Sequence, residues 1–116
     1  MITLYHNPRC SKSREGLQLL ELQGKPFTVI KYLNEPLTHN ELKDIIKKLG
    51  IKPIDLVRQK EKAWTDNYKG KQLTGDEVID ALAAHPALIQ RPIAVNGDKA
   101  VIARPAENIK KILYYF

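Results

Sequence analysis

The sequence predicts an α/β fold in which a mixed sheet of about four strands is flanked by helices. Three observations lead to this fold class. The chain begins with strand-like, helix-like and strand-like segments in succession, continues through a helical middle, and then gives a hairpin signal followed by a closing helical pattern. The helical middle, at about residues 37–88, is therefore predicted to be an insertion between the second and third strands.

The first three elements predict a βαβ unit with a parallel pair of strands. Residues 2–5, "ITLY", form a short apolar run, and residues 13–23 carry leucines at helical spacing before Gly24. Residues 26–33, "PFTVIKYL", are β-branched and aromatic enough for a second strand. Two strands joined through one helix are expected to lie parallel in the same sheet.

Two amphipathic helices are predicted in the middle of the chain, at residues 37–50 and 73–86. Each opens with a threonine and a glutamate three residues apart, the spacing of a capping box, in the pairs Thr38 with Glu41 and Thr74 with Glu77. The first helix is expected to stop at Gly50 and the second at Pro86. The polar stretch 64–71 between them is typical of a loop or a frayed helix.

The last part of the chain predicts a β-hairpin and a final helix. The turn signal is Asn-Gly-Asp-Lys at residues 96–99, within "RPIAVNGDKAVIARP" at residues 91–105. A helical pattern, "PAENIKKILYYF", covers residues 105–116. These two strands complete the predicted four-stranded sheet.

Length and composition indicate one globular domain spanning residues 1–116. Hydrophobic residues make up 43% and charged residues 28% of the chain, which excludes a disordered protein, and no apolar run is long enough to cross a bilayer. No basic region followed by a long apolar stretch marks a secretory signal, so a cytoplasmic protein with no membrane association is expected.

The net charge of +6 raises the question of nucleic-acid binding. Fourteen of the nineteen cations are lysines scattered along the chain rather than clustered in a stripe, which disfavours a nucleic acid as partner. The five arginines differ from the lysines in their positions. Two of them flank the only cysteine, and three stand singly at the ends of predicted elements: Arg9, Arg14, Arg58, Arg91 and Arg104.

The only cysteine, Cys10, lies in "HNPRCSKSR", the loop between the first predicted strand and helix. Because the thiolate is the nucleophilic form, a reactive cysteine needs a lowered pKa. The start of a helix stabilises negative sulfur, and nearby cationic or donor groups add to this effect: His6, Arg9, Lys12 and Arg14. The same features would hold a tetrahedral oxyanion such as phosphate, sulfate or arsenate above the sulfur.

An inert core cysteine is the alternative interpretation of Cys10. The residues around it are polar or charged, whereas an inert buried cysteine is normally surrounded by apolar residues. The sequence therefore favours a reactive thiol. No metal site is predicted, because His39 and His85 have no neighbouring ligands at metal-binding spacing.

The loop resembles the signature of the ArsC family, the arsenate reductases that use glutathione and glutaredoxin and have a thioredoxin-like fold. That signature is a histidine, three residues, a cysteine, three residues and an arginine, here His6, Cys10 and Arg14. The resemblance covers the whole chain and includes three further arginines of the family's oxyanion site: Arg58 in "LVRQKE", Arg91 in "QRPIAV" and Arg104 in "IARPAE". It also places the cis proline of thioredoxin-like proteins at Pro92.

The resemblance implies a mechanism in which the Cys10 thiolate attacks arsenate, or a similar oxyanion, held by the three arginines of the oxyanion site. His6 and Arg14 would tune the pKa of the thiol, and supporting roles fall to Asn7, Ser11, Ser13 and Pro92. Glutathione, as a co-substrate rather than a bound cofactor, would then attack the adduct, and glutaredoxin would resolve the mixed thiol species.

Two other functions within the same resemblance stay open. Spx-type regulators, which bind RNA polymerase, share the fold but usually carry a second cysteine where this chain has Ser13. An ArsC-like thiol oxidoreductase could act on another oxyanion or on glutathionylated substrates, and Lys12 stands where the family often has threonine. Because the chain has no second cysteine, any redox cycle at Cys10 needs an external thiol, which excludes a three-cysteine, thioredoxin-coupled reductase.

Overall fold

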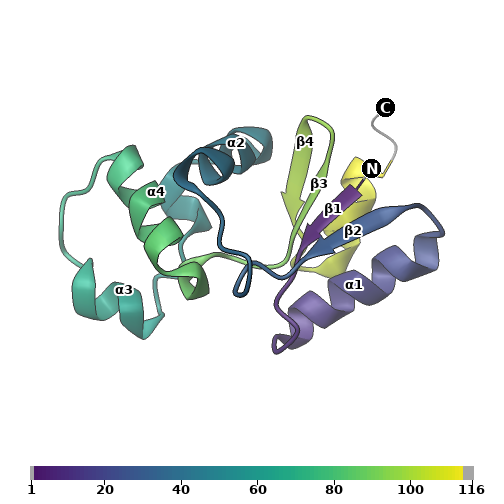
Figure 1. Cartoon of the computed structure of the whole chain (residues 1–116), viewed down its shortest axis with the longest axis horizontal. Coiled ribbons are helices and arrows are strands. Elements are labelled where there is room, and N and C mark those ends of the chain that lie inside the picture. The colour runs from purple at the N-terminus through teal and green to yellow at the C-terminus, as the bar shows by residue number, and fades with distance from the viewer. Residues whose placement is uncertain (1, 114–116) are drawn as a thin grey trace. The chain divides into compact units, whose positions relative to one another are not determined.

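A computed structural model of the chain describes residues 2–113 (Figure 1). Contacts between residues divide it into two compact units. The first unit is built from the segments up to Glu35 and from Arg91 onward, and the second is Pro36–Gln90. That residues 1–116 form a single domain stays a prediction.

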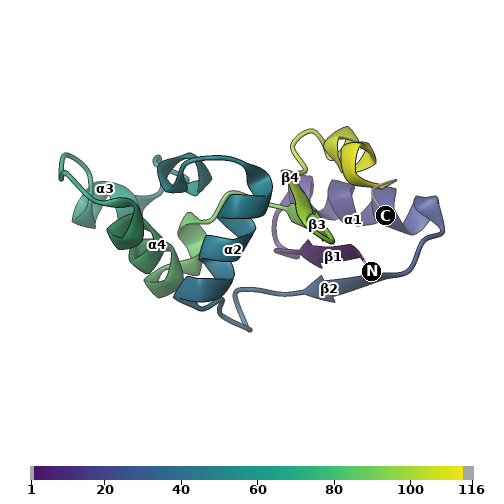
Figure 2. The ribbon, with the colours of Figure 1, turned by 90° about the horizontal axis from the view of Figure 1, so that it is seen from above.

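The first unit is built on a four-stranded mixed sheet (Figure 2). Its strands are β1 (Ile2–Tyr5), β2 (Phe27–Ile30), β3 (Ile93–Asn96) and β4 (Lys99–Ile102). They lie in the order β2-β1-β3-β4, with β1 parallel to β2 and the other neighbours antiparallel. The predicted parallel pair, the mixed sheet and the helical insertion between β2 and β3 are all confirmed.

Two helices cover one face of this sheet: α1 (Ser11–Gln23) and the 3₁₀ helix η3 (Ala106–Ile112) (Figure 2). Buried side chains from the sheet and both helices form the core: Ile2, Leu4, Leu20, Ala94, Ala103, Ile109, Ile112 and Leu113. The predicted final helix is thus present as a 3₁₀ helix, which starts with an i to i+3 hydrogen bond from Asn108 N to Pro105 O. The end of that prediction, residues 114–116, lies outside the described residues.

The predicted hairpin is confirmed, with Gly97 and Asp98 forming the turn between β3 and β4. Gly97 has a φ of +62°, a left-handed conformation that side chains disfavour and that tight hairpin turns require. The pairing continues past both strands, because Ala103 N donates to Pro92 O at 2.8 Å. Both peptide bonds that join an arginine to a proline here, Arg91–Pro92 and Arg104–Pro105, are cis.

The second unit is helical. Its elements are α2 (His39–Leu49), η1 (Pro53–Leu56), α3 (Lys62–Asn67), α4 (Gly75–Ala84) and η2 (Pro86–Leu88). Both predicted capping boxes are present at the starts of α2 and α4, and Gly50 ends α2 in a left-handed conformation. The stretch 64–71, predicted as a loop or frayed helix, holds the last four residues of the short helix α3 and the turn that follows it.

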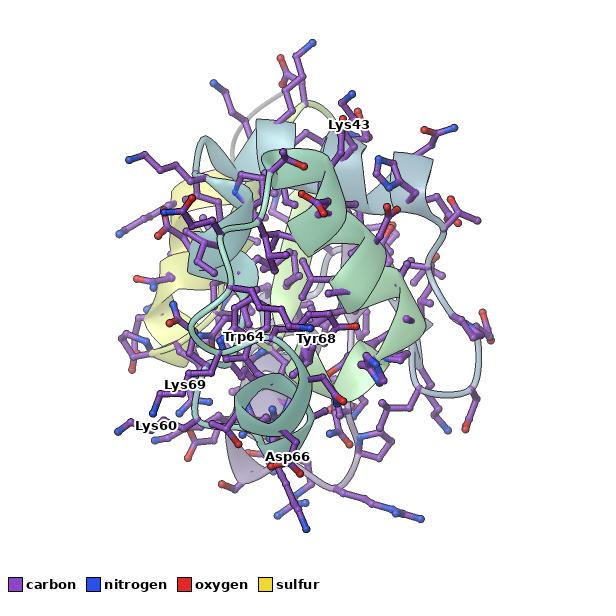
Figure 3. All side chains as sticks on the ribbon, turned by 90° about the vertical axis from the view of Figure 1, so that its left-hand side faces the viewer. Lys43, Lys60, Trp64, Asp66, Tyr68 and Lys69 are labelled. Atoms are coloured by element: carbon purple, nitrogen blue, oxygen red, sulfur yellow. The ribbon has the colours of Figure 1, made fainter. Side chains whose placement is uncertain are left out.

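Two groups of side chains join the helices of this unit. His39 Nδ1 of α2 lies 2.6 Å from Asp80 Oδ1 of α4. The buried ring of Trp64 stacks on Tyr68, with ring centroids 5.2 Å apart (Figure 3). Tyr68 in turn meets the ring of His85 edge-on, with centroids 5.9 Å apart. Trp64 is therefore a packing residue. Among residues 2–113 there is no helix of the length and apolar character needed to cross a membrane.

Candidate active site

Cys10 occupies the position directly before α1, as the strand-to-helix prediction required. Its backbone is extended, with φ −98° and ψ 124°, and its carbonyl accepts the first α-helical hydrogen bond, from Arg14 N at 3.0 Å. The N–H of Cys10 itself donates to Asn7 O at 3.0 Å, so the residues after β1 form a tight turn. The half-buried thiol thus lies beside the free N–H groups of the first turn of α1.

The pKa of Cys10 is lowered from its ordinary value. Burial of the thiol acts in the opposite direction, but the helix start and one arginine together outweigh it. The backbone N–H of Ser13, the charge and side-chain hydrogen bond of Arg91, and the backbone N–H of Lys12 all favour the thiolate. The surroundings of Cys10 therefore favour the thiolate over the thiol, as a reactive cysteine requires, and its role as the nucleophile stays a prediction.

His6 is buried and linked to α1 through a serine hydroxyl. His6 Nδ1 lies 2.8 Å from Ser13 Oγ, and the same oxygen accepts the backbone N–H of Asn7 at 2.9 Å. Burial lowers the pKa of His6, as do the charges of Lys31 and Arg14, against the hydrogen bond with Ser13. The fold therefore favours the neutral form of His6, which contributes hydrogen bonding to the loop.

Arg14 and Arg9 contact the loop rather than the sulfur. Arg14 Nη1 donates to Pro8 O at 2.9 Å, and Arg9 N donates to Asn7 Oδ1 at 3.0 Å. Ser11 is exposed at the first position of α1. These contacts fix the shape of the thiol loop, whereas the tuning of the Cys10 pKa by His6 and Arg14 stays a prediction.

Of the three predicted oxyanion arginines, Arg91 lies at the thiol. It is half-buried, hydrogen-bonds with Cys10, and has a buried Nε that donates to no acceptor within residues 2–113. An unsatisfied buried donor is rare in proteins, and a guanidinium that serves a ligand is one way it arises. This donor beside an activated thiol supports the prediction that the site takes an anion.

The other two arginines occupy different positions. The register of β3 and β4, continued by the bond from Ala103 to Pro92, sets Arg104 opposite Arg91 at one end of the hairpin, where Arg104 is exposed. Arg58 lies in the second unit, pairs with Glu61, and donates to Ala87 O at 3.3 Å. The convergence of all three arginines over Cys10 stays a prediction.

Gly16 lets α1 pack closely against the cis-proline segment. A Cβ at this buried glycine would lie 3.0 Å from Pro92 Cγ, closer than ordinary carbon contacts. Because Cys10 lies directly before α1 and Arg91 directly before Pro92, this contact helps to fix the thiol relative to the guanidinium.

Sequence reasoning missed two features of the site. Lys31, which follows β2, acts electrostatically on His6; its place near the end of the predicted strand at residues 26–33 was a usable signal. The second missed feature is the cis peptide bond between Arg104 and Pro105, which, like the first cis bond, joins an arginine to a proline. Within the part of the chain that the structure describes, no cluster of three or more histidine, cysteine or acidic side chains could hold a metal ion.

Comparison with known proteins agrees with this geometry. The model of the ArsC family matches residues 5–112. Proteins named "Arsenate reductase" from Neisseria meningitidis and Haemophilus influenzae are 43% and 44% identical over 114 residues; these cover 97% of this chain and 97% and 98% of the relatives. A solved structure of an arsenate reductase from Vibrio cholerae superposes with a TM-score of 0.92 at 43% identity, covering 97% of both chains. The predicted thioredoxin-like fold is confirmed.

Proposed function

Since the chain belongs to the ArsC family, we propose that it reduces arsenate to arsenite at Cys10, with glutathione and glutaredoxin as the external thiols. The observation that carries this proposal is the pairing of the activated Cys10 thiol with the Arg91 guanidinium. A thiolate supplies the nucleophile, and an arginine with a free buried donor supplies charge and hydrogen bonding for the oxygens of the anion.

In the proposed reaction, the Cys10 thiolate forms a sulfur–arsenic bond while a protonated oxygen leaves arsenic as water. Arsenic remains pentavalent in this adduct. The thiolate of glutathione then attacks the Cys10 sulfur, forming a disulfide and leaving the bonding electron pair on arsenic, which departs as arsenite. A glutaredoxin thiol takes over the glutathionyl group and regenerates Cys10.

The composition of the chain supports the need for external thiols. Two thiols must be oxidised for each arsenate reduced, and the chain contains one cysteine. Glutathione and glutaredoxin are abundant reductants of the cytoplasm, so the proposal includes a cytoplasmic location for the protein.

The decisive experiment is an assay of arsenate reduction with glutathione and glutaredoxin, comparing the wild type with Cys10→Ser. We expect activity to be abolished, because the serine hydroxyl is far less acidic than a thiol. The matched control is Gln18→Ala, a change at an exposed position of α1, which is expected to leave most of the activity. An inactive wild type, or residual activity in Cys10→Ser above a few per cent, would refute the proposal.

The roles of the remaining arginines are tested in the same assay. Planar guanidinium groups bind oxyanions through paired hydrogen bonds that lysine cannot reproduce. Arg58→Lys and Arg104→Lys should therefore weaken arsenate use nearly as much as the alanine variants do. Sulfate and phosphate should compete with arsenate, and a lack of competition would argue against an oxyanion site.

A further inference from the structure

A small polar pocket adjoins the thiol loop at the carboxyl ends of the parallel strands β1 and β2. His6, directly after β1, donates its backbone N–H to Ile30 O at the end of β2, which holds these two strand ends together. The pocket has a volume of about 210 Å³. Its lining comes from the loop before Cys10 and from the turn after β2: Asn7, Pro8, Arg9, Lys31, Leu33 and Asn34.

The charge of this pocket is positive and unneutralised. No acidic residue lines it, and none of the ion pairs among residues 2–113 involves Arg9 or Lys31. Glu35, the acid nearest to Lys31 in the chain, does not pair with it. Asn7 accepts the N–H of Arg9 through its side-chain oxygen, which leaves its Nδ2 group as a donor for a ligand. Two free cations and a carboxamide donor are the partners that a carboxylate requires.

The pocket is distinct from the place of the reacting oxyanion. Arsenate must reach the Cys10 sulfur and Arg91, and neither residue lines the pocket. The volume is also below the roughly 300–1,000 Å³ of pockets that enclose a whole small molecule. The pocket therefore fits one charged arm of a ligand whose reactive part lies at the neighbouring thiol.

We propose that this pocket binds a carboxylate of the small thiol that reacts at Cys10, as glutathione would present. The proposal rests on the proposed function, because it assigns a binding site to the co-substrate of that reaction. Arg9 and Lys31 would attract and hold the carboxylate while the sulfur of the same molecule reaches Cys10. Small thiols without carboxylates would lose this anchoring.

The test measures a reaction that needs no arsenate. The Cys10 thiolate attacks one sulfur of oxidised glutathione, forming the Cys10–glutathione disulfide and releasing one glutathione thiolate. Intact-protein mass spectrometry gives the rate of this reaction and of the corresponding reaction with bis(2-hydroxyethyl) disulfide, which carries no charge. The ratio of the two rates isolates recognition of the carboxylates, because any change in the reactivity of Cys10 affects both rates.

We expect Arg9→Gln and Lys31→Gln each to lower this ratio about three- to fivefold, the size of one lost exposed ion pair. The matched control is Lys110→Gln, which removes the same charge from an exposed position on η3 and should leave the ratio unchanged. A ratio that does not fall in the two pocket variants would overturn the proposal. An equal fall in Lys110→Gln would also overturn it, because the net charge alone would then explain the preference.

The outcome separates this proposal from the proposed function. A selective fall of the ratio in an enzyme that does not reduce arsenate would leave the pocket established and the arsenate reaction refuted. Arsenate reduction together with an unchanged ratio would refute the pocket alone.

Discussion

Ser13 Oγ lies 2.8 Å from Nδ1 of His6, and this contact joins the residue after β1 to the first turn of α1. Ser13 is fully buried, and its hydroxyl also accepts the N–H of Asn7. The loop that carries Cys10 is thus held by a side chain whose hydroxyl contacts the loop backbone and His6. The backbone N–H of the same serine stabilises the thiolate, so Ser13 supports the site in two separate ways.

Replacing Ser13 by alanine should lower the free energy of unfolding by about 1–3 kcal/mol, because the N–H of Asn7 and Nδ1 of His6 would be buried without partners. Urea denaturation measures this change. The control is Ser11→Ala, at an exposed position two residues earlier, which should change stability by less than about 0.5 kcal/mol. Equal stability of the two variants would show that the buried hydroxyl does not hold the loop.

Cys10 should ionise below the ordinary cysteine pKa of about 8.5, and Arg91→Ala should raise the midpoint because it removes a charge and a hydrogen bond from the thiolate. Arg91→Lys keeps the charge and is expected to give an intermediate value. The rate of alkylation by iodoacetamide as a function of pH reports all three midpoints.

The matched control for Arg91 is Lys12→Gln, which removes a cation next to Cys10 but keeps the backbone N–H that favours the thiolate. The Lys12 side chain pairs with Glu15 at 3.6 Å, so its loss should leave the midpoint nearly unchanged. If the midpoint shifts as much in Lys12→Gln as in Arg91→Ala, a general effect of positive charge explains the lowered pKa of Cys10, and the specific contact with Arg91 does not.

His6 should make the protein less stable in mild acid. Its pKa is lowered in the folded state, whereas in the unfolded chain it has the ordinary value of about 6.5. Below that pH the unfolded chain binds a proton that the folded protein does not bind, so this contribution to stability is fully present above about pH 6.5 and is lost as the pH falls.

Urea denaturation between about pH 5 and pH 8 should therefore show a steeper decline in the free energy of unfolding for the wild type than for His6→Gln. Parallel curves for the two proteins would mean that His6 binds its proton equally well in both states.

Gly16→Ala should fail to stabilise the protein, although alanine is favoured over glycine in a helix by about 1 kcal/mol. The added methyl group would meet Pro92 Cγ at 3.0 Å, and the cis-proline segment would have to shift. Thermal or urea unfolding gives the stability, with Gln18→Ala at an exposed position of α1 as the control. A gain of about 1 kcal/mol in Gly16→Ala would show that the segment moves aside freely.

The elements predicted from local sequence signals are the ones that the structure confirms. The capping boxes of Thr38 and Thr74 and the turn at Gly97 are specified by residues a few positions apart, so a single sequence suffices to place them. The final helix was harder to predict. Its apolar spacing suits both helix types, and the 3₁₀ form is seen only in the backbone hydrogen bonds after Pro105.

The chemistry of the thiol loop was partly predictable for a similar reason. The position of Cys10 before a helix follows from the chain order, and so does the presence of cations around it. The sequence does not reveal that burial and the charge of Lys31 lower the pKa of His6, because both depend on how the fold surrounds this side chain. The family resemblance named three distant arginines for the site, but it did not single out Arg91 as the one that acts on the sulfur.

The length of the two-residue turn between β3 and β4 determines which residues face each other at the opposite end of the hairpin. Arg91 and Arg104 lie opposite each other because the register Asn96↔Lys99 is maintained along both strands to the bond between Ala103 and Pro92. Inserting or deleting one residue beside Gly97 would shift that register and turn one arginine to the other face of the sheet. An exposed loop far from the thiol is thus expected to tolerate changes of side chain but not of length.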